Sequence, residues 1–387
     1  MKKIILLILS YLLISFNTYV FSTEDKNQNL LEIGVLAPFS GELKDLGEEI
    51  LYSVNLALHD LGNRNIKIFP EDSGSQNEKI VEACEKFRNN GIKIVIGPVQ
   101  SKQTNKLYDC KEIIFLSLSN MNSNINKNII MLGINLESQL LSIRNFVETK
   151  KKKKTLILFP KNIYTKHIEK TISQINFTNS KIFKYDQDPE KLTKQIERLT
   201  NYKQRKINLE SRIKKLEGSD QPKDLRELKN LKQKYTLGKI NFDSIIILDF
   251  GDSLKSVLTS LAYTDVSGEE ILIVTSNQWF DQSLLSETSI KSIYFPSINF
   301  KNFKNFKKEF FNIYKYNPAE ISILSYDAVG LIYYAWKQRG EIKSVNHFNF
   351  KKDIKGKVGK FNITDNKVIQ KLKVYRIKDG NFTEYKF

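Results

Sequence analysis

Side chains that commonly carry catalysis or bind metal are sparse in this chain. It has three histidines, His59, His167 and His347, among 387 residues. None has a second histidine, a cysteine or a carboxylate at the spacing of a zinc site. The GxSxG, HExxH and GxxxxGK[ST] motifs, which position a nucleophile, a catalytic zinc or a phosphate, are absent. The sequence therefore predicts no catalytic residues, no metal site and no cofactor.

Hydrolysis stays open as an alternative. The chain has 43 acidic residues, and a glycosidase needs only two carboxylates within roughly 5–10 Å. A serine nucleophile needs a positioned base. His59 lies within a helical pattern, and no serine can be paired with it.

Small polar residues follow several buried strands. These residues are Ser40, Ser101, Ser119, Asn120 and Tyr164. Open α/β sheets bind ligands at the carboxyl ends of their strands, and hydroxyls and backbone amides at helix N-termini suit a ligand carboxylate. We expect these five residues to line a ligand-binding cleft. Ordinary turn polarity is the alternative interpretation.

The elements that would carry these loops alternate between strand and helix. Leu31–Pro38, Ile92–Ile96 and Ile113–Leu118 are short apolar runs, and amphipathic stretches separate them. This order predicts a parallel sheet covered by helices on both faces. The pattern repeats after Ile129, which predicts a second α/β half. From Gly356 onward, alternating residues around tight turns predict antiparallel strands.

A charged segment interrupts the second half. Residues 189–236 contain no glycine before Gly218, and Leu209, Ile213 and Leu216 keep helical spacing. We expect a protruding helical hairpin with a thin apolar seam. It is either an insertion of the second lobe without a binding role or a docking site for a partner.

The chain begins with the form of a secretory signal. Two lysines precede an apolar run from Ile4 to Phe16, and Val20–Ser22 forms a short exit. The run is short for a bilayer of roughly 30 Å, so we expect cleavage of residues 1–22; a retained anchor is the alternative. No cysteine follows the run, which argues against a lipoprotein. No later stretch reads as a membrane helix, so we expect no stable membrane insertion.

The net charge of +18 favours anionic partners. An exported chain rarely meets nucleic acid, and the basic residues are dispersed and mostly lysine, so we expect no nucleic-acid partner. The lysine- and asparagine-rich composition indicates a Gram-negative bacterium with an AT-rich genome. The expected location is the periplasm.

The chain has two cysteines, Cys84 and Cys110. An oxidising compartment permits a disulfide between them, and two buried thiols are the alternative. A bridge closing this loop would contribute roughly 3 kcal/mol.

A series of motifs resembles the type I (leucine-binding) periplasmic binding proteins. In chain order they are IGVLAPFSGELKDLGEEILYSVNLAL, EDSGSQ, IVIGPVQS, IIFLSLSN, LILFPKNIYTKHI, FDSIIILDFGD and ILSYDAVGLIYYAW, and they span about Leu31 to Lys337. SNQW at Ser276–Trp279, the charged insertion and the strand-rich tail resemble the penicillin-binding protein activators of this superfamily.

The resemblance implies a non-catalytic protein of two Rossmann-like lobes joined by a three-strand hinge. Lobe 1 would hold residues 31–131 and 296–341, and lobe 2 residues 132–295 and 342–387. In leucine-binding relatives the residues matching Ser101, Ser119 and Tyr164 bind the amino acid. The chain departs from them at Ser119-Asn120-Met121-Asn122 and at Thr165, and no acidic residue can be assigned to a ligand ammonium group.

Two functions follow as hypotheses. The first is a penicillin-binding protein activator, which regulates peptidoglycan synthesis by contact with a synthase. The second is a substrate-binding protein that delivers an amino acid or a similar small solute to an ABC permease by hinge closure. A hydrolase on this scaffold is the third alternative, because fold alone does not fix function.

Overall fold

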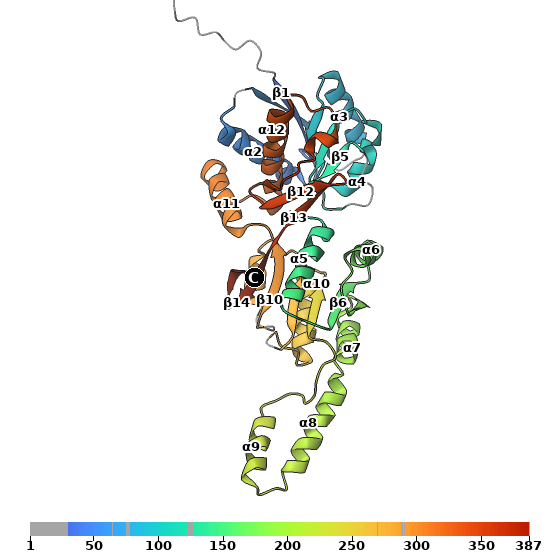
Figure 1. Cartoon of the computed structure of the whole chain (residues 1–387), viewed down its shortest axis with the longest axis vertical. Helices are drawn as coiled ribbons and strands as arrows, with labels where there is room; N and C mark the ends of the chain where they lie inside the picture. The colour runs from blue at the N-terminus through green and yellow to red at the C-terminus, as the bar shows by residue number, and fades with distance from the viewer. Residues whose placement is uncertain are drawn as a thin grey trace, which may run out of the picture.

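The computed structural model describes residues 30–63, 65–74, 78–121, 127–268, 270–287, 289 and 291–386. The predicted signal peptide, residues 1–22, lies outside this part of the chain, as does Asn122. Within the described residues, no helix is both long and apolar enough to span a membrane. The two lobes are stacked along the long axis, and a helical arm extends beyond the second (Figure 1).

The first lobe is built on a mostly parallel sheet. Its strands are β1 (Leu31–Ala37), β2 (Ile66–Asp72), β3 (Ile94–Ile96), β4 (Ile114–Ser117), β5 (Ile129–Met131), β11 (Ile354–Lys355), β12 (Lys360–Thr364) and β13 (Lys367–Lys371). Their order in the sheet is β11-β12-β13-β5-β4-β3-β1-β2. The inner strands β3, β4 and β5 are fully buried apolar runs, as expected where helices cover both faces.

The second lobe repeats this plan. Its strands are β6 (Thr155–Pro160), β7 (Ser180–Tyr185), β8 (Ser244–Ile247), β9 (Leu272–Thr275), β10 (Ile293–Ser297), β14 (Lys373–Lys378) and β15 (Asn381–Tyr385). They are ordered β15-β14-β10-β9-β8-β6-β7. The β10–β14 and β14–β15 pairs are antiparallel, and the other strand pairs of this sheet are parallel. This architecture confirms the predicted pair of doubly wound α/β lobes.

Helices cover the sheets where the sequence predicts amphipathic stretches. The α-helices of the described residues are α2 (Lys44–Leu61), α3 (Glu78–Asn89), α4 (Ser101–Thr104), α5 (Leu136–Thr149), α6 (Thr165–Ile175), α7 (Pro189–Leu199), α8 (Tyr202–Leu216), α9 (Pro222–Leu231), α10 (Gly251–Tyr263), α11 (Phe300–Tyr314) and α12 (Ile323–Arg339). Of these, α8 and α9 do not cover a sheet but extend beyond the second lobe (Figure 1). In α2, for example, Ile50, Val54 and Ala57 are buried at helical spacing. Gly62 ends this helix in the left-handed conformation.

Three segments cross between the lobes. They connect β5 to α5, β10 to α11, and β13 to β14. The last crossing consists of Leu372 alone, because β13 ends at Lys371 and β14 begins at Lys373. These crossings form the three-strand hinge that the resemblance implies.

The tail is divided differently from the sequence-based expectation, which placed residues 342–387 in lobe 2. Strands β11–β13 belong to the first sheet, where Lys367 of β13 pairs in parallel with Met131 of β5. That expectation is therefore wrong for Ile354–Lys371, and also for Val345–Phe348, which contacts α12 of the first lobe. Alternation along the tail predicts strands, but it does not encode which exposed sheet edge accepts them.

The insertion also differs from the predicted hairpin over residues 189–236. Its first helix, α7, packs on the second lobe and buries Leu192 and Ile196 in the main core. The protruding hairpin consists of α8 and α9, which extend beyond the lobe in Figure 1. A separate apolar cluster of Leu209, Leu216 and Leu231 joins these two helices.

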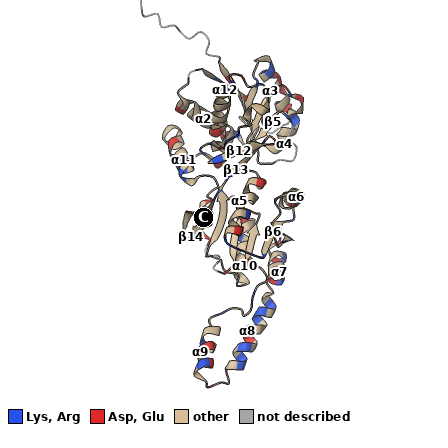
Figure 2. Cartoon of the chain, viewed as in Figure 1, with Lys and Arg blue, Asp and Glu red and all other residues tan. Residues whose placement is uncertain are grey.

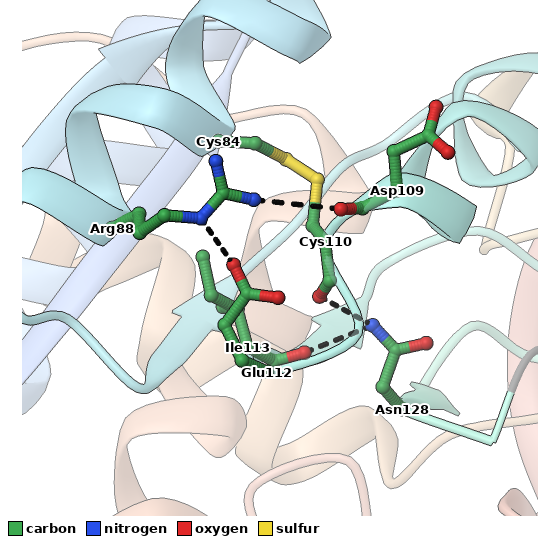
Figure 3. The surroundings of a disulfide bond; sticks show 7 residues. All are labelled: Cys84, Arg88, Asp109, Cys110, Glu112, Ile113 and Asn128. Atoms are coloured by element: carbon green, nitrogen blue, oxygen red, sulfur yellow. Dashed lines mark hydrogen bonds and ion pairs between the residues drawn. A yellow bond between two sulfur atoms is a disulfide. The ribbon is translucent and has the colours of Figure 1, made fainter.

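A disulfide joins Cys84 of α3 to Cys110, with a Cα–Cα distance of 6.1 Å. Figure 3 shows how its surroundings fix the loop after Cys110. Arg88 Nε donates to Glu112 Oε1 at 2.7 Å, and Asn128 Nδ2 donates to the carbonyl oxygens of Cys110 and Ile113. Both cysteines are buried, so the bond ties α3 to the loop that leads into β4.

Replacing both cysteines (Cys84→Ala with Cys110→Ala) should lower the free energy of unfolding by about 3 kcal/mol, because the unfolded chain loses a cross-link. The bond spans a sequence separation of 26 residues. Denaturant melts of the oxidised protein and the double variant measure the difference. The reduced wild-type protein is the control and should unfold near the variant's midpoint. Coinciding midpoints for oxidised and reduced protein would contradict the prediction.

Candidate functional site

A cavity of about 680 Å³ lies between the two lobes. It is lined by loops that follow strands β3 and β4 of the first sheet and β6, β8 and β9 of the second. The carboxyl ends of the parallel strands in both sheets therefore face the cavity, which is where open α/β sheets bind ligands.

Four of the five sequence-predicted residues line this cavity: Ser101, Ser119, Asn120 and Tyr164. Ser101 begins α4, and its Oγ lies 3.7 Å from Met121 Sδ. Ser119 is buried, and its Oγ accepts a hydrogen bond from the Met121 amide at 3.3 Å. Tyr164 comes from the opposite lobe, just before α6, and is 45% exposed. The cavity thus brings together hydroxyl groups from both lobes.

Ser40 is placed elsewhere. Its Oγ donates to Asp72 Oδ2 at 2.7 Å and accepts from Lys79 Nζ at 2.8 Å. Ser40 does not line the cavity. Its hydroxyl is instead part of a polar cluster that connects the end of β1 to the end of β2.

The structure adds cavity residues that the sequence did not single out as site residues. They come from the ends of β8 and β9 and from α5 and α6, and include Gln139, His167, Asp249, Phe250, Asn277 and Trp279. Asp249, Phe250, Asn277 and Trp279 follow predicted strands, so the strand-end rule that selected Ser119 applies to them as well. Phe250 is 73% exposed, which gives the cavity a large accessible aromatic surface.

Trp279 and Phe280 are held in a strained backbone conformation. Their φ angles are 47° and 62°, a left-handed region that bulky side chains rarely adopt. Phe280 is anchored in an aromatic cluster, with its ring centroid 4.3 Å from Phe300 and 4.8 Å from Tyr375. Asn277 Oδ1 accepts from the Trp279 amide at 3.0 Å. Packing on the far side thus fixes Trp279 at the cavity.

The charges at the cavity are few and mostly engaged. None of its described lining residues is a lysine or an arginine. Asp249 accepts hydrogen bonds from the Tyr185 hydroxyl and the Phe250 amide, and Asp281 accepts from Ser283. Burial, with a smaller effect of Lys170, lowers the pKa of His167, which favours its neutral form. The cavity therefore offers neutral hydrogen-bonding groups, aromatic surface and the two carboxylates of Asp249 and Asp281, with no lysine or arginine among its described lining residues.

Comparisons with known proteins agree with this geometry. The family model described as periplasmic binding protein matches residues 31–176. No curated protein sequence matches the chain. The family match over residues 31–176, together with the fold, supports the resemblance to the type I periplasmic binding proteins.

Solved structures of two functional kinds share the fold. The C-domain of LpoA from Haemophilus influenzae, described as a regulator of PBP1A, is 16% identical, with a TM-score of 0.60 over 92% of this chain and 99% of that one. The branched-chain amino acid binding protein LivJ from Streptococcus pneumoniae, in complex with isoleucine, is 17% identical, with a TM-score of 0.53 over 92% and 98%.

A third structure is the ligand-binding protein of a branched-chain amino acid ABC transporter from Burkholderia xenovorans. It is 14% identical and has a TM-score of 0.66 over 92% of this chain and 94% of that one. The chain therefore has the type I periplasmic binding protein fold, which is shared by binding proteins of amino acid transporters and by a regulator of PBP1A.

Asp72→Asn should destabilise the protein by about 1 kcal/mol at pH 7. Burial raises the pKa of the Asp72 carboxyl, but hydrogen bonds from Lys79, Ser40 and the Gly74 amide outweigh burial and lower the pKa to about 2. The stabilisation is therefore present above about pH 4 and is lost as the pH falls toward 2. Urea melts at pH 7 and pH 2.5 should show a smaller difference at the lower pH. Asp109→Asn, on the same lobe, is the control, and an Asp72→Asn effect that is equal at both pH values would contradict the assignment.

Proposed function

We propose that this protein is an exported, non-catalytic periplasmic protein that regulates peptidoglycan synthesis by direct contact with a synthase. The similarity of its fold to the PBP1A regulator LpoA supports the proposal. The observation that carries it is the α8–α9 hairpin, a structured arm away from the cavity.

Hydrogen bonds between α8 and α9, and at the base of the hairpin, stabilise its conformation outside the lobe. Arg212 makes two hydrogen bonds to Glu227, each 2.8 Å long, across the two helices. At the base, Arg205 is buried and donates to the Thr264 carbonyl and to Thr236 Oγ. The Leu237 amide donates to the Arg205 carbonyl at 2.9 Å, which closes the base. An arm fixed in this way can present a defined surface to a partner.

The outer surface of the hairpin is basic. Residues 202–231, which form α8 and α9, contain nine lysines and arginines against five acidic residues, and Figure 2 shows the basic positions along α8. Lys203 and Lys214 lie with Ile207 on the face of α8 opposite the buried Leu209 and Leu216. Neither lysine forms an ion pair with the described residues. An acidic surface on the synthase would complement this face.

Replacing Ile207–Tyr235 by a short Gly-Ser linker should abolish capture of the partner synthase and leave both lobes folded. The linker is sterically feasible because Arg205 and Leu237 are already hydrogen-bonded neighbours. Purified peptidoglycan synthases of the source bacterium are the bait, and their glycan polymerisation rate is the second readout. Circular dichroism melts verify folding.

A charge-reversal double variant tests the basic face of α8 directly. Lys203→Glu with Lys214→Glu should weaken capture at least tenfold, because like charges would face each other. Lys301→Glu with Lys308→Glu makes the same charge change on two exposed lysines of α11 and should bind as wild type does. Full capture by the linker variant would exclude the hairpin as the contact.

The cavity favours a second candidate function, a substrate-binding protein for an ABC importer of amino acids or similar small solutes. Its support is the meeting of Ser101, Ser119, Asn120 and Tyr164 at one interlobe cavity. Against it stand the lack of a lining cation for a ligand carboxylate and the engagement of Asp249 within its own lobe.

A thermal-shift screen with amino acids distinguishes the two functions. Under the importer function, a ligand at a hundredfold its Kd should stabilise the protein by about 2.7 kcal/mol. Ser101→Ala and Tyr164→Ala should each reduce that shift, and Ser40→Ala, outside the cavity, is the matched control. No shift with any amino acid would remove amino acids as the transported solutes.

A further inference from the structure

A second cavity, of about 760 Å³, lies at the end of the second lobe farthest from the interlobe cavity. Its walls come from the end of α5, the residues that precede β9 and β10, and the turn between β14 and β15. These are the amino ends of the parallel strands, whereas the interlobe cavity lies at their carboxyl ends. The two cavities are therefore separate sites.

The lining of this distal cavity is strongly basic. It contains five cationic residues, Lys150, Lys152, Lys291, Arg376 and Lys378, against two acidic residues, Glu287 and Asp379. Both carboxylates are engaged, because Glu287 accepts from Ser289 and Asp379 lies 3.7 Å from Lys378. The cavity therefore carries a net positive charge.

Two of the cations are held in place by neutral groups. Arg376 Nε donates to Ser292 Oγ at 2.7 Å, and its guanidinium lies 5.7 Å from the Tyr294 ring centroid. Lys150 Nζ lies 5.9 Å from the same ring and donates to the Tyr385 hydroxyl at 2.5 Å. Neither forms an ion pair with the described residues. Two oriented positive charges therefore lie beside the same tyrosine ring, and neither is in an ion pair with a carboxylate of the described residues.

We propose that this distal cavity binds a phosphate group. With Nε engaged, the terminal nitrogens of Arg376 remain available for bidentate contact with an anion. Lys150 adds a second positive charge beside the same ring, and Lys152 and Lys378 lie on the cavity wall. A group with two negative charges and several acceptor oxygens matches this set better than a single carboxylate does. The phosphate belongs either to a soluble phosphate ester or to a lipid headgroup.

Binding assays on the mature protein distinguish these sources. Calorimetric titration with inorganic phosphate and with glycerol 3-phosphate, at low ionic strength, measures the soluble source. Sedimentation with phosphatidylglycerol–phosphatidylcholine vesicles, against pure phosphatidylcholine vesicles, measures the lipid source. We expect the wild-type protein to bind at least one of these phosphate probes.

Lys150→Gln with Arg376→Gln should weaken that binding at least fivefold. Lys106→Gln with Lys111→Gln is the matched control, because it removes two exposed lysines from the first lobe, one of them also stacked over a tyrosine. Arg376→Lys keeps the positive charge but removes the guanidinium group that makes two parallel hydrogen bonds, so this variant should bind the phosphate probe more weakly than wild type does. If the first double variant loses its thermal transition, Lys152→Gln with Lys378→Gln tests the same cavity at its exposed wall.

Binding of soluble phosphate esters alone, or of anionic vesicles alone, supports the site and identifies the source. Failure of folded wild-type protein to bind any phosphate probe would overturn the proposal. Equal weakening by the distal and control double variants would also overturn it, because net charge alone would then explain binding. Neither result bears on capture of the synthase by the hairpin, which is a separate measurement.

Discussion

The arrangement of the two lobes depends on a close contact between Gly133, in the crossing from β5 to α5, and Ser119, in the loop after β4. The Gly133 amide donates to the Ser119 carbonyl at 3.1 Å, and a Cβ at Gly133 would lie only 2.1 Å from that oxygen. Any side chain there would push the first crossing segment away from the end of β4. Gln370 Nε2 also donates to the Leu132 carbonyl, and so ties β13 to the same crossing. The position of one lobe relative to the other, and with it the interlobe cavity, depends on this close packing.

The second lobe has two chemically different ends. The cavity at the carboxyl ends of its strands has aromatic and polar walls with two carboxylates, Asp249 and Asp281, whereas the opposite end has a basic cavity. The sheet separates these ends, so a partner or anion at the distal end would leave the interlobe cavity accessible. The two-lobe fold and its interlobe cavity can therefore stay unchanged while binding surfaces for other molecules lie elsewhere on the second lobe.

The cavity residues were predicted from the sequence in part. Ser101, Ser119, Asn120 and Tyr164 line one cavity because strand ends in parallel sheets converge. Ser40 also follows a strand, but Asp72 and Lys79 take its hydroxyl, and this cluster requires β2 beside β1. Asp249 and Trp279 follow predicted strands too, and they were missed because only small polar residues and one tyrosine were selected at the strand ends, not an acidic residue or a tryptophan.

Local sequence patterns predict the alternation of strands and helices, the two α/β lobes and the charged helical insertion. These features follow from local periodicity, since each buried face repeats within a few residues. Those patterns do not predict that β13 joins the first sheet, that α7 packs on its lobe, or that Lys150 and Arg376 both lie beside the Tyr294 ring. These outcomes depend on pairing between segments far apart in the chain, and such pairing leaves no periodic signal in either segment alone.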